Sequence, residues 1–246
     1  MTGQPGRYRA RVTRVAIVLC GDLDRRISSQ YAPYETLYAD FLHLGTTNDL
    51  ELETFRAHEG DLPKDIGSFD AMIIGGSPAG VYEPHEWIPP LLSTIRESLQ
   101  LQVATWGICF GHQAIAAALG AEVSKSPRGW NLAVQEYEFC GSRAPRSADQ
   151  LRLIAFHQDQ VRSVPEGTSC YLTSPGCEIA GLVGDNLMTM QPHPEFTPHI
   201  TSALLEASRG SRISESEIDE ALTRLDGPLS SEIASELFWS SVRAAL

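Results

Sequence analysis

The chain has 246 residues, of which 42% are hydrophobic and 20% are charged, and its formal net charge is -12 at pH 7. This composition is ordinary for a globular protein with a large core. The negative charge argues against nucleic acid and against an anionic membrane as partners, because both need a cationic face on the protein. Small-molecule chemistry is the better fit.

Short apolar runs predict strands, and longer runs with helical periodicity predict helices. In chain order, strands are expected at residues 15–19, 51–55, 71–74, 103–106, 133–139, 151–156, 170–173, 179–183 and 187–190. Helices are expected at 33–44, 89–99, 113–119, 198–207, 216–225 and 230–245. Strands and helices alternate in the first half, which predicts a parallel sheet with helices on both faces. The later strands follow one another closely, so we expect antiparallel hairpins at one edge.

We expect a single domain over residues 1–246, with about residues 206–246 as a helical C-terminal extension. No linker rich in Gly, Ser or Pro and no block of like charges marks a boundary. The arginine-rich start precedes only the short apolar run 15–19, which is shorter than a signal-peptide core or a membrane span. Neither export nor a membrane is therefore expected.

One thiol, Cys109, lies between Gly107 and Gly111 where an apolar strand is predicted to turn into a helix. At a helix N-terminus, unpaired backbone N–H groups and the positive end of the helix dipole favour the reactive thiolate. The two glycines permit a sharp turn and leave room for a substrate, as in the nucleophile elbow of hydrolases. Cys109 is therefore the predicted nucleophile, and the alternative is a buried structural cysteine.

A nucleophilic thiol needs a base that a third group holds in one tautomer. His193 and Glu195 follow an apolar strand and lie two residues apart, so their side chains project on the same side of an extended segment. Pro192 and Pro194 stiffen the backbone between them. The segment predicts a base and its orienting carboxylate, and the alternative is a surface loop with an incidental histidine.

The five cysteines, at positions 20, 109, 140, 170 and 177, do not have the spacing of metal ligands. An odd number that includes a candidate nucleophile suits a reducing cytosol, so a cytoplasmic protein is expected. Gly75-Gly76 lacks the later glycine and lysine of a phosphate-binding loop, and no Gly-x-Gly-x-x-Gly follows a strand. No metal and no cofactor are predicted.

These segments together resemble the class I glutamine amidotransferase family, and more closely its stand-alone members similar to the glutaminase domain of GMP synthase and to γ-glutamyl peptidases. Segment 107–113 resembles the nucleophile loop of the family, 191–195 its His and Glu segment, and 75–78 its oxyanion loop. Weaker matches lie at 126–130 and 157–161, so the resemblance covers about residues 15–205. It implies a flavodoxin-like three-layer α/β sandwich, with a mostly parallel central sheet, helices on both faces and some antiparallel edge strands.

The resemblance also implies a reaction. Cys109 attacks the side-chain amide carbon of glutamine, ammonia leaves, and water hydrolyses the glutamyl thioester. Both tetrahedral intermediates place negative charge on the former amide oxygen, which preorganised backbone N–H groups stabilise. Phe110 is one expected donor. The second is Gly76 or Ser77, which stays open because Ser77 stands where the family more often has glycine before proline.

By the same resemblance, Gln113, His157 and Gln158 are expected to line the substrate pocket. The alternative for Gln113 is an ordinary residue of the first helical turn. Arg128 and Trp130 are candidates for contact with a substrate carboxylate or a partner, and the alternative for Trp130 is core packing.

Three functions remain open. The first is a glutaminase that supplies ammonia to a separate synthetase, because the residues after Glu195 are too few for a second catalytic domain. The second is a free-standing γ-glutamyl hydrolase or peptidase, since the same triad cleaves any γ-glutamyl amide and the Gly-Ser-Pro loop resembles that of γ-glutamyl peptidases. The third is a non-catalytic binding module that kept the fold, against which the intact Cys109, His193 and Glu195 weigh.

Overall fold

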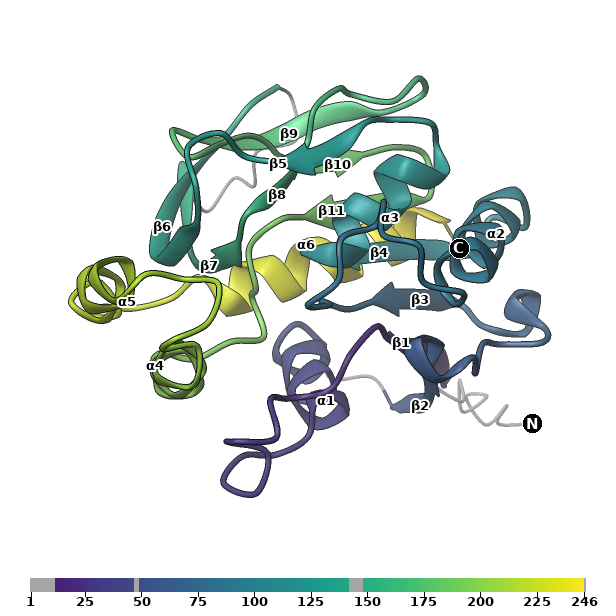
Figure 1. The fold of residues 1–246 in the computed structure, drawn as a ribbon. Coiled ribbons are helices and arrows are strands. Elements are labelled where there is room, and N and C mark those ends of the chain that lie inside the picture. The colour runs from purple at the N-terminus through teal and green to yellow at the C-terminus, as the bar shows by residue number, and fades with distance from the viewer. Residues whose placement is uncertain (1–11, 47–48, 142–147, 246) are drawn as a thin grey trace, which may run out of the picture.

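The computed structural model describes residues 12–46, 49–141 and 148–245, with side chains up to residue 241. Its main strands are β1 (Thr13–Leu19), β2 (Leu50–Arg56), β3 (Ala71–Ile74), β4 (Ala104–Ile108), β6 (Asn131–Phe139), β7 (Gln150–His157), β9 (Ser169–Ser174), β10 (Cys177–Val183) and β11 (Leu187–Met190). They form one nine-stranded sheet in the order β2-β1-β3-β4-β11-β10-β9-β6-β7 (Figure 1). Two short strands, β5 (Val123–Lys125) and β8 (Asp159–Val161), pair with each other beside it.

The sheet has a parallel half and an antiparallel half. Strands β2, β1, β3, β4 and β11 run parallel, whereas β11, β10, β9, β6 and β7 pair antiparallel. Every residue of β3, β4 and β11 is buried, as expected for central strands covered on both faces. The predicted flavodoxin-like three-layer sandwich, with antiparallel strands at one edge, is confirmed.

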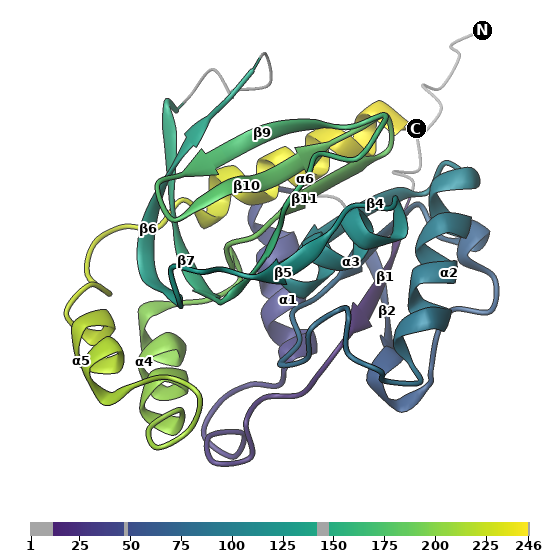
Figure 2. The same cartoon turned by 45° about the horizontal axis from the view of Figure 1, so that its top comes forward.

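Helices cover both faces of the parallel half (Figure 2). On one face lie α1 (Tyr34–Leu44) and α6 (Ser231–Ala245), and on the other lie α2 (Ile88–Gln100) and α3 (Phe110–Ala118). Successive side chains of β1 point to opposite faces of the sheet. Val15 and Ile17 therefore join the hydrophobic core on the face covered by α1 and α6, and Ala16 and Val18 join the core on the face covered by α2 and α3. Two short 3-10 helices, η1 (Ala57–Glu59) and η2 (Ile66–Ser68), connect elements of this half.

The C-terminal helices pack on different parts of the sheet. Helices α4 (Pro198–Ala207) and α5 (Glu215–Leu222) lie beside the antiparallel half, where Leu205 and Ile218 bury against Leu132 of β6. The chain then returns, and α6 packs on the central strands, with the ring of Phe238 edge-on to Trp106 at 4.9 Å between centroids. Within the described residues, no helix is both long enough and apolar enough to cross a membrane.

Apart from small shifts at the ends of most elements, two details differ from the sequence expectation. Helix α3 begins at Phe110, directly after the candidate nucleophile, rather than at Gln113. Gly111 lowers the helix propensity of this turn, but packing against the sheet keeps it helical. Strands β5 and β8 were not expected, because each has only three residues and β5 runs from a buried Val123 to an exposed Lys125.

Candidate active site

Three neighbouring strands end side by side at one edge of the sheet. Ile74 of β3 pairs with Gly107 of β4, and Ile108 of β4 pairs with Met190 of β11. In a parallel arrangement these carboxyl ends meet, so the segments that follow them share one crevice. The loop after Ile74, the turn at Cys109 and the segment from Gln191 onwards therefore converge there.

Cys109 sits at a strained turn between β4 and α3. Its φ of 54° and ψ of -105° lie outside the regions that L residues ordinarily populate. A β-carbon at Gly107 would lie 2.5 Å from the carbonyl oxygen of Gly111, and one at Gly111 would lie 2.1 Å from that of Ile74. Side chains are thus excluded at both positions. The turn presents the thiol at the N-terminus of α3.

His193 and Glu195 form a buried hydrogen-bonded pair. Nδ1 of His193 donates to Oε1 of Glu195 at 2.7 Å, and both side chains are almost inaccessible to solvent. The imidazole also stacks on the ring of Phe196 at 4.2 Å, and Phe196 stacks in turn on Tyr34. The backbone N–H of His193 donates to the carbonyl of Ile154 in β7. The ring is therefore held in one tautomer and one orientation, with Nε2 free to face the crevice.

The thiol and the imidazole lie together in this crevice. A β-carbon built on Gly76 would come within 3.0 Å of Cε1 of His193 and 3.9 Å of Cβ of Cys109. Burial lowers the pKa of His193, but the charge of Glu195, followed by the charge and hydrogen bond of Cys109, raises it to about 10. The charged form of the imidazole is thus favoured by its two polar neighbours against the effect of burial.

The loop after β3 brings backbone N–H groups to the same place. The N–H of Gly76 donates to the hydroxyl of Tyr38 at 2.9 Å, so this donor is engaged by α1. The next residue along the loop is Ser77, which lines the cleft together with Cys109. The N–H of Gly111 donates to the carbonyl of Gly75 at 3.1 Å, which ties this loop to the start of α3.

The crevice opens into a cleft of about 250 Å³. It is lined by residues from the three converging segments, from the loop after β1 and the start of α1, from β5, β7, β8 and the turns beside them, and from α4 and the turn after it: Asp22, Asp24, Tyr34, Gly76, Ser77, Pro78, Ala79, Cys109, Gln113, Lys125, Trp130, Phe156, His157, Gln158, Asp159, His193, Phe196, Leu204, Ser208 and Arg212. Its volume suits a ligand the size of an amino acid or a dipeptide. The residues predicted for the pocket, Gln113, His157 and Gln158, all lie on its wall.

Gln113 and His157 are held by neighbours in the wall. The amide nitrogen of Gln113 donates to the carbonyl of Asp159 at 3.0 Å and to Oε1 of Gln191 at 3.2 Å. Nδ1 of His157 donates to the same Asp159 carbonyl, at 3.2 Å. Burial lowers the pKa of His157 to about 3, against a smaller upward effect of that hydrogen bond, so the ring is neutral. A neutral ring here is a hydrogen-bonding group rather than a charge.

Three residues of the site have no role in the sequence prediction. Tyr38 lies inside the predicted helix 33–44, and its contact with Gly76 depends on tertiary packing. Gln191 belongs to the recognised segment, but only the structure connects it to Gln113. Arg212 follows α4 and reaches the cleft from outside every recognised segment, while Arg128 lies outside the cleft lining.

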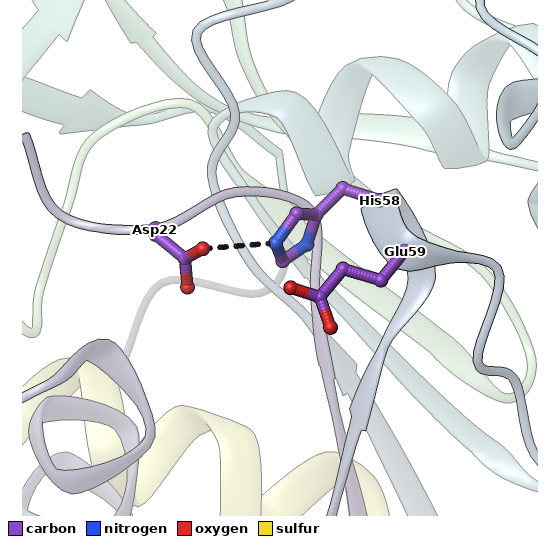
Figure 3. A group of neighbouring side chains, drawn as sticks. All are labelled: Asp22, His58 and Glu59. Atoms are coloured by element: carbon purple, nitrogen blue, oxygen red, sulfur yellow. Dashed lines mark hydrogen bonds and ion pairs between the residues drawn. The ribbon is translucent and has the colours of Figure 1, made fainter.

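Asp22, His58 and Glu59 form a second polar cluster near the cleft (Figure 3). Their possible ligand atoms lie within 4.8 Å of one another. However, Nε2 of His58 faces Oδ2 of Asp22 at 3.2 Å, its Nδ1 faces the carbonyl of Leu19, and Arg56 pairs with Asp22. Partial burial raises the pKa of Asp22, but the bonds to His58 and Arg56 bring it below its ordinary value. The cluster is an ion-pair network around the loop at Asp22, and we assign it no metal.

The chain is similar to known proteins over the segment that contains Cys109, His193 and Glu195. The model of the family described as glutamine amidotransferase class-I matches residues 35–208. A glutamine amidotransferase-like protein of Schizosaccharomyces pombe is 28% identical over 222 residues, which cover 82% of this chain and 87% of the relative. Gamma-glutamyl peptidase 4 of Arabidopsis thaliana is 28% identical over 189 residues, which cover 72% of this chain and 73% of the relative.

A solved structure shows the same fold. The crystal structure of a glutamine amidotransferase from Methylobacillus flagellatus aligns over 96% of both chains with a TM-score of 0.72 and 22% sequence identity. At this identity the likeness concerns the fold.

Proposed function

The chain belongs to the class-I glutamine amidotransferase family, and we propose that it hydrolyses the γ-amide bond of glutamine or of a γ-glutamyl compound through a Cys109 thioester. The observation that carries this proposal is the buried His193–Glu195 hydrogen bond of 2.7 Å, which borders the same cleft as the strained Cys109 turn. Nucleophile, base and orienting carboxylate are thus available to one substrate.

In the proposed reaction, His193 takes the proton of Cys109, and the thiolate sulfur attacks the amide carbon. The carbon–nitrogen bond breaks, and His193 returns the proton to the leaving nitrogen, which departs as ammonia or an amine. Water, deprotonated by His193, then cleaves the thioester and releases glutamate. Glu195 holds the imidazole in the required tautomer, and the raised pKa of His193 supports an imidazolium beside the thiolate.

The negative charge of the intermediates requires two backbone donors. We assign them to Phe110, at the start of α3, and to Ser77. Gly76 is the less suitable loop donor, because its N–H is directed at the Tyr38 hydroxyl. Gln113, His157 and Gln158 are proposed to hold the glutamyl part of the substrate.

A second function is supply of the released ammonia to a separate synthetase. The S. pombe relative is named as amidotransferase-like, which favours this alternative. The Arabidopsis relative is named as a γ-glutamyl peptidase, which favours a free-standing hydrolase. Both functions share the same thioester chemistry and differ in the leaving group.

The proposal is tested by measuring glutamate release from glutamine and from a γ-glutamyl dipeptide. We expect turnover by the wild-type chain and none by Cys109→Ala. Cys140→Ala is the matched control, because this thiol is half-buried and lies outside the cleft lining. A wild-type chain that releases glutamate from neither compound, or a Cys109→Ala variant that stays active, would contradict the proposal.

A further inference from the structure

The active-site cleft contains positive charge that the protein itself does not neutralise. Lys125 and Arg212 both line it. Within the described part of the chain, neither side chain forms an ion pair with a carboxylate, and the one hydrogen bond of the Arg212 guanidinium goes to the backbone carbonyl of Pro78 at 3.1 Å. A guanidinium has five N–H groups, so most of its donors remain for a ligand.

Two of the three acidic side chains that line the cleft are paired with arginines. Asp22 pairs with Arg56, and Asp24 pairs with Arg26. The hydroxyl of Tyr82 lies 3.2 Å from both oxygens of Asp159 and donates its one proton to this carboxylate, which has no cationic partner among the described residues. Lys125 and Arg212 therefore outnumber the one carboxylate of the cleft without a cation, and the cleft is suited to an anionic group of the substrate.

Arg212 belongs to the wall that carries the base. The lining residues Phe196, Leu204 and Ser208 continue from His193 along α4 to Arg212, and the imidazole of His193 stacks directly on Phe196. Arg212 donates to the carbonyl of Pro78, two residues after Gly76, where a β-carbon would lie 3.0 Å from Cε1 of His193. Because His193 must protonate the leaving nitrogen and Arg212 borders the loop that approaches His193, the leaving group is expected on the side of Arg212.

The position of Arg212 is fixed by two contacts. Its guanidinium lies over the ring of Trp130, with Cζ 5.9 Å from the centroid, and it donates to the carbonyl of Pro78. Pro78 directly follows Ser77, so the guanidinium borders the loop that bears one proposed oxyanion donor. Arg212 also lies beyond residue 208, where the family match ends.

We propose that Arg212 binds a carboxylate carried by the leaving group, so that the substrate class is γ-glutamyl peptides whose second residue has a free α-carboxylate. This inference rests on the proposed function. A planar guanidinium binds a carboxylate through two parallel charge-assisted hydrogen bonds. Glutamine does not use this site, because its leaving group is ammonia.

The reaction balances without a further reagent. The sulfur of Cys109 bonds to the γ-carbonyl carbon, the bond from that carbon to the peptide nitrogen breaks, and His193 gives that nitrogen a proton. The amino acid leaves with its carboxylate released from Arg212. Water then adds to the thioester, which yields glutamate and the free thiol.

The test uses two substrates that differ only in one charge, γ-glutamylalanine and γ-glutamylalaninamide, with glutamine as a third. The measured quantity is kcat/KM for glutamate release by the full chain. We expect the wild type to prefer the acid over the amide by about 10- to 100-fold, as charge-assisted hydrogen bonds predict. In Arg212→Met, kcat/KM for the acid should fall to that of the amide, while the amide and glutamine change less than about twofold. Arg212→Lys should keep part of the preference, because the charge remains without the planar fork.

Arg128→Met is the matched control. Arg128, like Arg212, is exposed and donates to a proline carbonyl, that of Pro175, but it lies outside the cleft lining. Its removal should leave all three substrates unchanged. An active wild type without preference for the acid would overturn the inference and leave the proposed function intact. Equal losses for all three substrates in Arg212→Met would also overturn it, since they would assign Arg212 to the glutamyl part. Inactivity of the wild type on every substrate would overturn both.

Discussion

The hydroxyl of Tyr38 accepts a hydrogen bond from the backbone N–H of Gly76 at 2.9 Å. Tyr38 lies on α1 and is fully buried, so the contact joins a helix of one sheet face to the loop that borders the nucleophile. The bond fixes the orientation of the peptide before Gly76 and, through it, the direction of the next N–H, that of Ser77. Tyr38 is therefore proposed as a positioning residue for the oxyanion loop.

Tyr38→Phe is expected to lower kcat by about 5- to 50-fold with little change in KM, because a misdirected donor costs transition-state stabilisation. Steady-state kinetics of glutamate release measure this split. Tyr137→Phe is the control, since Tyr137 is also buried and its hydroxyl has no hydrogen-bond partner among the described residues. An unchanged kcat in Tyr38→Phe would rule out the positioning role.

The pKa of His193 should depend on both of its polar neighbours. Burial lowers it, while the charge of Glu195 and, next, that of Cys109 raise it to about 10. We expect Glu195→Gln to lower the pKa of His193 more than Cys109→Ala does. Nuclear magnetic resonance titration of the imidazole Cε1–H signal gives both values. A pKa that is the same in Cys109→Ala and in the wild type would mean that the thiol and the imidazole are not in contact.

His112 makes the fold sensitive to acid. Burial lowers its pKa to about 4, against the hydrogen bond of Nε2 to the carbonyl of Ile179, and Nδ1 faces the hydroxyl of Thr189 at 2.7 Å. The folded-state pKa lies below the unfolded value of about 6.5, so the neutral ring stabilises the fold above pH 6.5, and this stabilisation is lost as the pH falls towards 4.

We therefore expect the free energy of unfolding to be lower at pH 4.5 than at pH 7. In His112→Gln this difference between the two pH values should be smaller than in the wild type by on the order of 2 kcal/mol. Urea unfolding at the two pH values measures it. The exposed His43 serves as the control, because His43→Gln should leave the fall unchanged. An equal fall in His112→Gln and in the wild type would contradict the assignment.

Helix α6 is proposed to belong to the same folding unit as the sheet, because Phe238 packs edge-on against Trp106 of β4. Phe238→Ala is expected to lower the free energy of unfolding by about 3–5 kcal/mol in a single cooperative transition. Circular dichroism and tryptophan fluorescence should report the same midpoint. Two separate transitions, or no loss of stability, would indicate an independently folded C-terminal extension.

The sequence predicted the elements that end at strong local signals. Strands β3 and β11 and helix α4 have the predicted bounds, because apolar runs meet glycine or proline at their ends. Strands β5 and β8 were missed, since three residues cannot show a period and their pairing is set by the surrounding fold. Segments 107–113 and 191–195 could be recognised because strand, turn and reactive residue are contiguous there.

The roles of Tyr38 and Arg212 could not be predicted in the same way. From the sequence alone, Tyr38 is predicted to be an ordinary core residue of an amphipathic helix. Arg212 is predicted to be a solvated charge in a polar turn. Each acquires a role only through a contact with a loop far away in the sequence, at Gly76 and at Pro78. The sequence offered Arg128 as one candidate for contact with a substrate carboxylate or a partner, whereas in the structure Arg212 lines the cleft.

The proposed mechanism requires a covalent glutamyl thioester on Cys109 during turnover. Mass spectrometry can detect it in enzyme that is mixed with a γ-glutamyl dipeptide, quenched with acid and digested. We expect one glutamyl group on the peptide that contains Cys109, and none on any peptide of Cys109→Ala. Turnover of the dipeptide with the glutamyl group on another residue, or with none at any quench time, would contradict it.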